Sequence, residues 1–191
     1  MSEKINKKIR FKKAVWDYYK THKRADLPWR KTTDPYHILV SEIMLQQTQV
    51  RRVVGAYKAF IKAFPSVRSL ARAPLAKVLT QWSGLGYNRR ARYLHECAQT
   101  IVSKYKGILP KETKEIESLP GIGDYTANAL RAFAYNEPSL CIETNIRTVF
   151  LHHFFPKTRR LVSDKEILGF VAETLDQKNP REWYFALMDY G

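Results

Sequence analysis

Residues 119–127 read Leu-Pro-Gly-Ile-Gly-Asp-Tyr-Thr-Ala, so two glycines lie one residue apart between stretches of helical sequence. Glycine permits a tight backbone turn and the close approach of a partner. The helix expected over 124–134 has free backbone N–H groups at its start, and such groups suit a phosphate. The pattern therefore indicates two helices joined by a tight glycine turn that contacts a phosphate backbone. An ordinary turn between packed helices is the alternative.

The charge of the chain favours the phosphate interpretation. The 191 residues include 33 Lys and Arg against 18 Asp and Glu, which gives a net charge of +15 at pH 7. Such an excess indicates a polyanionic partner, either nucleic acid or an anionic membrane surface. Together with the glycine turn, it makes residues 119–127 a helix–hairpin–helix motif that contacts the DNA backbone without base specificity.

Several protein classes are excluded by composition. No run reaches the roughly 18 apolar residues of a membrane span, and the basic N-terminus lacks the apolar stretch of a secretory signal. The two cysteines, Cys97 and Cys141, are too few for a disulfide framework or a four-cysteine metal site within this chain. We expect reduced thiols and an intracellular protein that does not bind membranes.

Apolar residues recur at three- and four-residue steps along most of the chain, and few windows alternate with period two. The sequence therefore predicts an all-α protein. A basic N-terminal tail is expected to lead into the first helix, and Thr113 to cap the helix that follows it. The expected helices cover 8–22, 36–64, 67–72, 74–82, 89–105, 113–119, 124–134, 145–154, a segment opened by a capping box at 163–166, and 181–189.

A first candidate catalytic group lies in the segment SEIMLQQTQ, residues 41–49. Glu42 stands in an apolar stretch, where loss of hydration is expected to raise the pKa of its carboxyl and make it a proton donor near neutral pH. The glutamines at 46, 47 and 49 supply neutral donors and acceptors for base edges. The alternative places Glu42 on the solvated stripe of a helix.

A second carboxylate, Glu143, precedes Asn145 at the start of a predicted helix. An acidic group there commonly does no more than cap the helix. Together, however, Glu42 and Glu143 are two carboxyls in different environments. One acid and one stabiliser of an oxocarbenium-like state suffice to cleave a glycosidic bond.

A third segment, WSGLGYNRRAR (82–92), combines a glycine-hinged loop, the aromatic Tyr87 and an arginine-rich helix start. An aromatic wedge inserted between base steps helps to kink a duplex. A solvated basic helix with a buried tyrosine is the alternative.

Together these segments resemble the helix–hairpin–helix (HhH-GPD) DNA glycosylase superfamily, and most closely its adenine-DNA glycosylase (MutY) branch. The similarity extends from about residue 24 to 191. It rests on LPWR (27–30), DPY (34–36), SEIMLQQTQV (41–50), GLGYNRRARYL (84–94), LPGIGDYTA (119–127) and Asn145.

The resemblance implies a role for each matching residue. Glu42 matches the general acid that protonates the departing adenine, and Asn145 an asparagine that organises the catalytic carboxylates. Tyr125 occupies the position of the lyase lysine of bifunctional relatives, so a monofunctional enzyme is expected. The implied DNA contacts are Gln46, Gln47, Thr48, Tyr87, Arg89, Gly121, Gly123 and Thr126; the implied base-pocket residues are Leu27, Trp29, Arg30 and Phe185.

Three features depart from the family pattern. Glu143 replaces the catalytic aspartate, which moves the carboxyl by one methylene; a shift of about 1 Å costs on the order of 10²-fold in rate. The chain stops before the four cysteines that bind an iron–sulfur cluster and before the domain that senses 8-oxoguanine. Phe185 stands where a polar residue facing adenine is expected.

The resemblance implies two lobes, a helical barrel over 32–137 and a second lobe from 1–31 and 138–191, with Glu143 and Asn145 facing Glu42 across a flipped base. The implied reaction releases adenine mispaired with 8-oxoguanine or guanine from duplex DNA. The alternatives are a mismatch thymine or uracil glycosylase and a catalytically decayed DNA-binding protein. We expect a monomer in a prokaryotic cytoplasm, associated with the nucleoid, with no cofactor except a monovalent or alkaline-earth cation at the hairpin.

Overall fold

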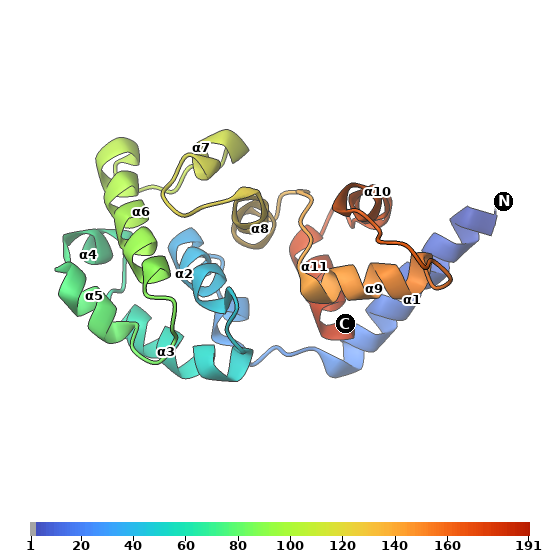
Figure 1. Ribbon diagram of the computed structural model, residues 1–191, viewed down its shortest axis with the longest axis horizontal. Coiled ribbons are helices and arrows are strands. Elements are labelled where there is room, and N and C mark those ends of the chain that lie inside the picture. The colour runs from blue at the N-terminus through green and yellow to red at the C-terminus, as the bar shows by residue number, and fades with distance from the viewer. Residues whose placement is uncertain (1–2) are drawn as a thin grey trace. The chain divides into compact units, whose positions relative to one another are not determined.

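The computed structural model describes residues 3–191, with side chains from residue 5 onward. Over these residues the chain forms eleven α-helices and one short 3₁₀ helix, with no β-strand (Figure 1). The all-α fold predicted from the sequence is confirmed. None of the described helices is long and apolar enough to cross a bilayer.

The chain divides into two compact units. The hairpin unit comprises Asp26–Tyr135, and the terminal unit comprises the residues up to Ala25 together with Asn136–Gly191. The two lobes predicted from the sequence have their boundaries at 31/32 and 137/138. That these lobes are separate domains stays a prediction.

The hairpin unit consists of short and medium helices joined by tight turns. Its elements are η1 (Pro28–Lys31), α2 (Pro35–Leu45), α3 (Val50–Ala63), α4 (Val67–Arg72), α5 (Leu75–Gln81), α6 (Arg89–Tyr105), α7 (Thr113–Glu117) and α8 (Asp124–Tyr135).

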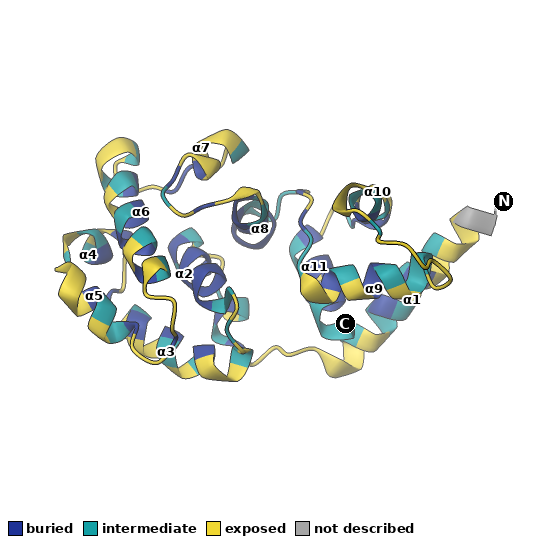
Figure 2. Ribbon diagram, in the orientation of Figure 1, coloured by how far each residue is buried: buried dark blue, intermediate teal, exposed yellow. Residues whose placement is uncertain are grey.

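Helix α2 forms the centre of the hairpin unit. It packs against α3, α6 and α8, and Figure 2 shows it buried along most of its length. Its sequence explains this position, because residues 38–44 are apolar apart from Ser41 and Glu42, and a helix that is apolar on all sides belongs in a core. Asp34 caps the helix by accepting a hydrogen bond from Tyr36 N at 2.8 Å. Any polar group on α2 is therefore held in a fixed, largely dry environment.

The prediction of a single helix over 36–64 is wrong. The structure breaks it into α2 and α3, and Gln47 between them has a left-handed backbone with φ of 52°. The chain leaves the helix at Gln46, and Thr48 N donates to Leu45 O at 3.2 Å to close the turn. Apolar residues recur at helical spacing on both sides of the break, so the pattern alone hides it.

The terminal unit packs four helices from the two ends of the chain. They are α1 (Glu3–His22), α9 (Thr144–Phe154), α10 (Asp164–Thr174) and α11 (Pro180–Tyr190). Helix α1 packs on α11, and α9 contacts both α10 and α11. Phe11 anchors α1, with its ring centroid 5.2 Å from that of Phe150 and 6.0 Å from that of Trp183.

The structure also differs from the sequence-based predictions at the ends of some helices. The predicted basic tail is wrong over the described residues, because α1 already begins at Glu3. Glu112, rather than Thr113, is the N-cap residue of α7. The capping box that opens α10 is confirmed, since Ser163 and Glu166 each accept a hydrogen bond from the other's backbone N–H.

Candidate active site

Glu42 is a buried carboxyl in the middle of α2. It is 9 % exposed, and its neighbours Ser41 and Ile43 are 1 % and 3 % exposed. Tyr125, in the first turn of α8, donates a hydrogen bond from its phenol to a carboxylate oxygen of Glu42 at 3.3 Å. The alternative of a solvated glutamate is therefore wrong. The structure instead provides a carboxyl with limited access to water and a polar partner, an arrangement suited to general acid chemistry.

Tyr125 belongs to the motif of residues 119–127, which forms a tight turn between α7 and α8. Ile122 N donates to Leu119 O at 3.1 Å. Gly121 has a φ of +75°, and a Cβ built there would lie 2.6 Å from Cβ of Tyr93, so only glycine fits. Gly121 and Gly123 are both exposed. The turn therefore presents accessible backbone at the start of the helix that carries Tyr125.

Three residues assigned to DNA contact are engaged within the protein. Gln46 Nε2 donates to Thr126 Oγ1 at 3.4 Å, and Thr126 is only 3 % exposed. Thr48 Oγ1 donates to Gln46 O at 3.2 Å. These contacts connect the hairpin helix α8 to the break between α2 and α3.

Gln47 and Tyr87 differ from these residues because both are exposed. Tyr87 is 64 % exposed, and the two residues have left-handed backbones with φ of 52° and 49°. Gln47 lies in the glutamine loop (residues 46–49) and Tyr87 in the tyrosine loop (residues 83–88). Non-glycine residues in this conformation are uncommon and mark strained turns of functional interest.

Arg90, which is not among the site residues predicted from the sequence, links these two loops. Its guanidinium donates to the carbonyl oxygens of Ile43 at 2.9 Å and Leu85 at 3.3 Å, and burial lowers the pKa of this group. No local pattern in the sequence marks it among the three arginines of segment 82–92. Of the other two, Arg89 is exposed and lies over the ring of Tyr93.

The second carboxylate and its asparagine lie in the terminal unit. Glu143 is the N-cap residue of α9, and one of its oxygens accepts a hydrogen bond from Ile146 N at 2.8 Å. Its other carboxylate oxygen accepts from Asn145 Nδ2 at 3.2 Å. Glu143 therefore does cap its helix, as the structural alternative predicts, and Asn145 orients the same carboxylate.

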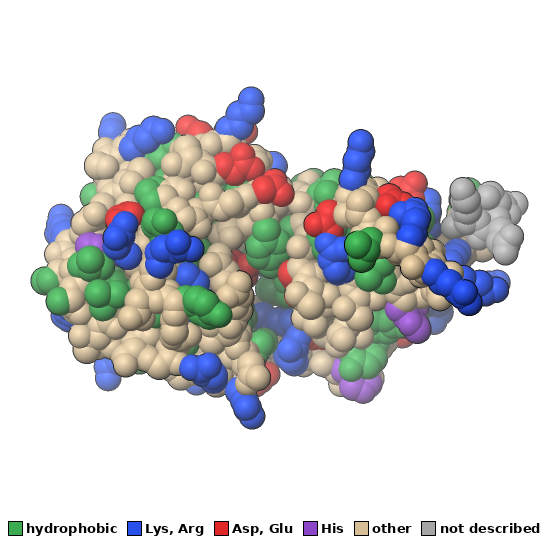
Figure 3. Space-filling model, viewed as in Figure 1, with side chains coloured by type: hydrophobic (Ala, Val, Ile, Leu, Met, Phe, Trp, Pro, Cys, Tyr) green, Lys and Arg blue, Asp and Glu red, His purple; other side chains and the backbone are tan. Residues whose placement is uncertain are grey.

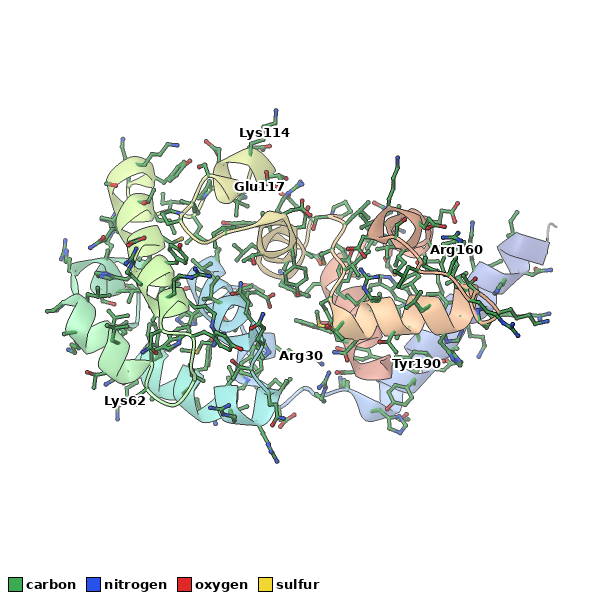
Figure 4. All side chains as sticks on the ribbon, viewed as in Figure 1. Arg30, Lys62, Lys114, Glu117, Arg160 and Tyr190 are labelled. Carbon is green, nitrogen blue, oxygen red and sulfur yellow. The ribbon has the colours of Figure 1, made fainter. Side chains whose placement is uncertain are left out.

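The residues assigned to the base pocket are mostly core residues of their own units. Leu27 and Trp29 are 7 % and 6 % exposed, and the Trp29 ring packs edge-on to Tyr57 at 5.6 Å. Phe185, in α11 of the terminal unit, is 5 % exposed. Arg30, labelled in Figure 4, is half-buried on η1.

Lysine and arginine side chains are spread over the face shown in Figure 3, on both units. The described residues contain no group of three or more His, Cys, Asp or Glu side chains arranged to hold a metal ion. Cys97 is buried in the hairpin unit, and this burial raises the pKa of its thiol to about 12. Cys141, the second cysteine, is buried in the other unit.

The glycine turn between α7 and α8, with a buried carboxyl on α2 next to it, is a helix–hairpin–helix arrangement. Residues 40–171 match the model of the HhH-GPD superfamily of base excision DNA repair proteins, and the chain belongs to that superfamily.

Similar proteins with assigned names include an adenine DNA glycosylase and a thymine/uracil-DNA glycosylase. The adenine DNA glycosylase of Buchnera aphidicola subsp. Baizongia pistaciae is 36 % identical over 95 % of this chain and 52 % of its own length. The thymine/uracil-DNA glycosylase of Pyrobaculum aerophilum is 31 % identical over 95 % of this chain and 81 % of its own length. The structure of a thermostable thymine-DNA glycosylase superposes with a TM-score of 0.90 at 26 % identity, covering 99 % of this chain and 88 % of that one. The chain spans about half the length of the adenine-specific relatives it matches.

Proposed function

We propose that this chain is a DNA glycosylase, which hydrolyses the N-glycosidic bond of a base flipped out of duplex DNA. The observation that carries the proposal is the hydrogen bond between Tyr125 and Glu42. It joins a buried acid to the first turn of the hairpin helix, so the group that would protonate a base lies in the same unit as the turn that would hold the DNA backbone. Such an enzyme must extrude its target nucleotide to reach the bond.

Glu42 is proposed as the general acid. Its proton passes to the departing base as the bond between the base and the sugar C1′ breaks. The carboxylate of Glu143, held by Asn145, stabilises the sugar cation, electrostatically or by transient attachment. Water then adds a hydroxyl group at C1′ and releases a proton. The half-buried position of Glu143 and its hydrogen bond to Asn145 support this role, and capping α9 is compatible with it.

The enzyme is proposed to be monofunctional. A phenol, rather than an amine, approaches Glu42 from α8. A Schiff base with C1′ requires a nucleophilic amine at this point, and Tyr125 cannot supply one. The product is then an intact strand with an abasic site.

Adenine opposite 8-oxoguanine or guanine is the first proposed target, because the adenine-specific relatives match most of this chain. Thymine or uracil opposite guanine is the second, because the thymine/uracil-specific Pyrobaculum enzyme is 31 % identical over 95 % of this chain. Phe185 is apolar, and this favours the second target by removing an expected polar contact to adenine. The decayed-enzyme alternative differs from both by predicting no base release.

The proposed partner is duplex DNA with a mispaired or damaged base, bound by a monomer in a prokaryotic cytoplasm. The exposed turn at Gly121 and Gly123 is proposed to hold a phosphate, with a monovalent or alkaline-earth cation on its carbonyls. The net charge of +15 supports several phosphate contacts, each of which would release counterions. Affinity for duplex DNA should therefore fall steeply with salt, and a nearly flat salt titration would exclude the proposed partner.

A base-release assay tests the function. Duplexes carrying adenine:8-oxoguanine, adenine:guanine, thymine:guanine and uracil:guanine pairs are incubated with excess protein, then treated with alkali to cleave abasic sites. Release of adenine alone supports the first target, and release of thymine or uracil the second. Duplex binding without release from any pair overturns the enzymatic proposal and favours the decayed enzyme.

A further inference from the structure

We propose that Arg90 is a positioning residue that fixes the glutamine and tyrosine loops against the helix carrying Glu42. The proposal rests on the proposed function, because it assigns these loops to the DNA. Arg90 is not proposed to touch the substrate. It is proposed to act through Gln47 and Tyr87, which are held ready for the base stack before DNA arrives.

The contacts of Arg90 reach three segments of the chain. Its guanidinium donates to six acceptors, which belong to the end of α2, to the glutamine loop and to the tyrosine loop. They are the carbonyl oxygens of Ile43, Met44, Gln46, Leu85 and Gly86 and the hydroxyl of Thr48.

Arg90 binds the C-terminal end of α2. The last carbonyls of a helix have no partner within the helix, and they carry its negative dipole end. Arg90 supplies both donors and positive charge to Ile43 and Met44, one and two residues beyond Glu42. It thereby ends the helix after Leu45 and frees the chain to turn at Gln47.

The tyrosine loop is fixed from the same side. The Arg90 guanidinium carbon lies 5.5 Å from the ring centroid of Trp82 and 5.4 Å from that of Tyr87. Trp82 also donates from Nε1 to Gly86 O at 3.1 Å. Tyr87 is mostly exposed yet has a fixed neighbour on one ring face, so its orientation is set without burying it.

Strain explains why such a fixing residue is needed. Gln47 and Tyr87 are both held in left-handed conformations that disfavour side chains with a Cβ. Such conformations persist only where the surroundings over-determine them. Among the described side-chain donors, Arg90 alone contacts both loops. Arg52 donates to Gly84 of the tyrosine loop only, and Arg51 donates to Gln49 of the glutamine loop only.

The first test measures amide hydrogen exchange in the free protein, so it does not depend on any enzymatic activity. Arg90→Met keeps the aliphatic stem and removes every donor, and Arg92→Met is a matched change at an exposed arginine two residues on. We expect exchange in residues 46–49 and 83–88 to rise about tenfold in Arg90→Met, with α8 unchanged and Arg92→Met like the native chain. Arg90→Lys, which retains the charge but loses the fork geometry, should lie between them.

Unchanged exchange in the two loops would overturn the proposal. Uniformly faster exchange across the whole hairpin unit would also overturn it, because Arg90 would then serve core stability rather than loop position. Arg90→Lys keeps the test decisive if Arg90→Met fails to fold, since loop-restricted acceleration in the lysine variant is still expected.

The second test uses DNA. The substrate is the mispair on which the native chain acts. Arg90→Met should lower the single-turnover rate about 10²-fold, because misplacing a group by roughly 1 Å has a cost of this size. The Kd for the duplex should change less than about threefold. The loss should be smaller in a Tyr87→Ala background, because Arg90 acts through that residue. A weaker Kd with an unchanged rate would show a direct phosphate contact and contradict positioning. If no mispair is cleaved, the proposed function fails while the exchange result still decides the role of Arg90.

Discussion

Tyr125 and Glu42 are separated by 83 residues, yet the phenol of one donates to the carboxylate of the other at 3.3 Å. This bond ties α8, which follows the glycine hairpin, to α2 at the centre of the unit. Movement of the hairpin on binding a DNA backbone would therefore be transmitted to the candidate acid.

Glu42→Gln should abolish base release while duplex binding is retained. The amide preserves the shape of the side chain and still accepts from Tyr125, but it has no acidic proton to give. Loss of a general acid lowers the rate by about 10²- to 10⁴-fold. Single-turnover assays and gel-shift titrations measure both quantities. The control is Glu117→Gln, an exposed carboxylate on α7 that is labelled in Figure 4. Full activity in Glu42→Gln would remove Glu42 from the mechanism.

Tyr125→Lys should create an adduct with abasic DNA that borohydride can trap, whereas the native chain and Tyr125→Phe should form none. The substitution brings an amine close to Glu42, and an amine is the group that a Schiff base requires. Denaturing gels after reduction with borohydride report the adduct. Stoichiometric trapping by the native chain would contradict a monofunctional enzyme.

Glu143→Gln separates catalysis from helix capping. If the carboxylate stabilises the sugar cation, base release should be lost, although the melting temperature falls only by the equivalent of about 1 kcal/mol for a weaker cap. Glu143→Asp keeps a favourable N-cap residue, so any change in its single-turnover rate reports carboxyl position alone. An unchanged rate in Glu143→Gln would show that Glu143 only caps α9 and takes no part in catalysis.

The decayed-enzyme alternative makes a different prediction for the same variants. It expects no base release from the native chain on any mispair and recovery only in Glu143→Asp. Rates for the native, Gln and Asp forms on adenine:8-oxoguanine and thymine:guanine duplexes distinguish it from the catalytic interpretation.

Gln47→Gly should be better tolerated than the same change two residues away. Gln47 has a φ of 52°, where glycine relieves strain, whereas Gln49 has a φ of −63°, where glycine only adds freedom to the unfolded chain. We expect the free energy of unfolding of Gln47→Gly to exceed that of Gln49→Gly by about 1–2 kcal/mol. Urea denaturation measures the difference. Equal stabilities would show that the left-handed turn is not strained.

Acid should weaken the start of α10. Arg160, labelled in Figure 4, and then the backbone and hydroxyl of Ser163 lower the pKa of the Glu166 carboxyl to about 2 from an ordinary 4.5. Because the folded-state pKa is depressed, this contribution to stability is complete above about pH 4.5 and disappears as the pH falls towards 2. The melting temperatures of the native chain and Glu166→Gln should therefore differ at pH 6 and converge near pH 2.5. A constant difference would contradict the linkage.

Features encoded by neighbouring residues were predictable from the sequence. The burial of Glu42 follows from the apolar residues beside it, and the capping box at Ser163 from a spacing of three. The N-terminal start of α1 was missed because its many charges resemble a solvated tail, while Phe11 and Val15, which bind it to the core, come later.

Features caused by distant residues were not predictable. The helix break at Gln47 depends on Arg90, 44 residues from the carbonyl of Gln46 that it binds. Tyr125 was assigned by its position in a motif, but its hydrogen bond to Glu42 depends on how α8 packs against α2. Local periodicity carries no information about such contacts.

The order of the two units along the chain has a consequence for biosynthesis. The hairpin unit is one uninterrupted segment, so all of its residues are available to fold once Tyr135 has left the ribosome. Helix α1 precedes the hairpin unit, but the rings that cover Phe11 belong to α9 and α11, which follow that unit. Helix α1 must therefore wait, with its apolar face uncovered, until the whole hairpin unit and then α9 and α11 have been made. During that interval the nascent chain is most exposed to aggregation and to capture by chaperones.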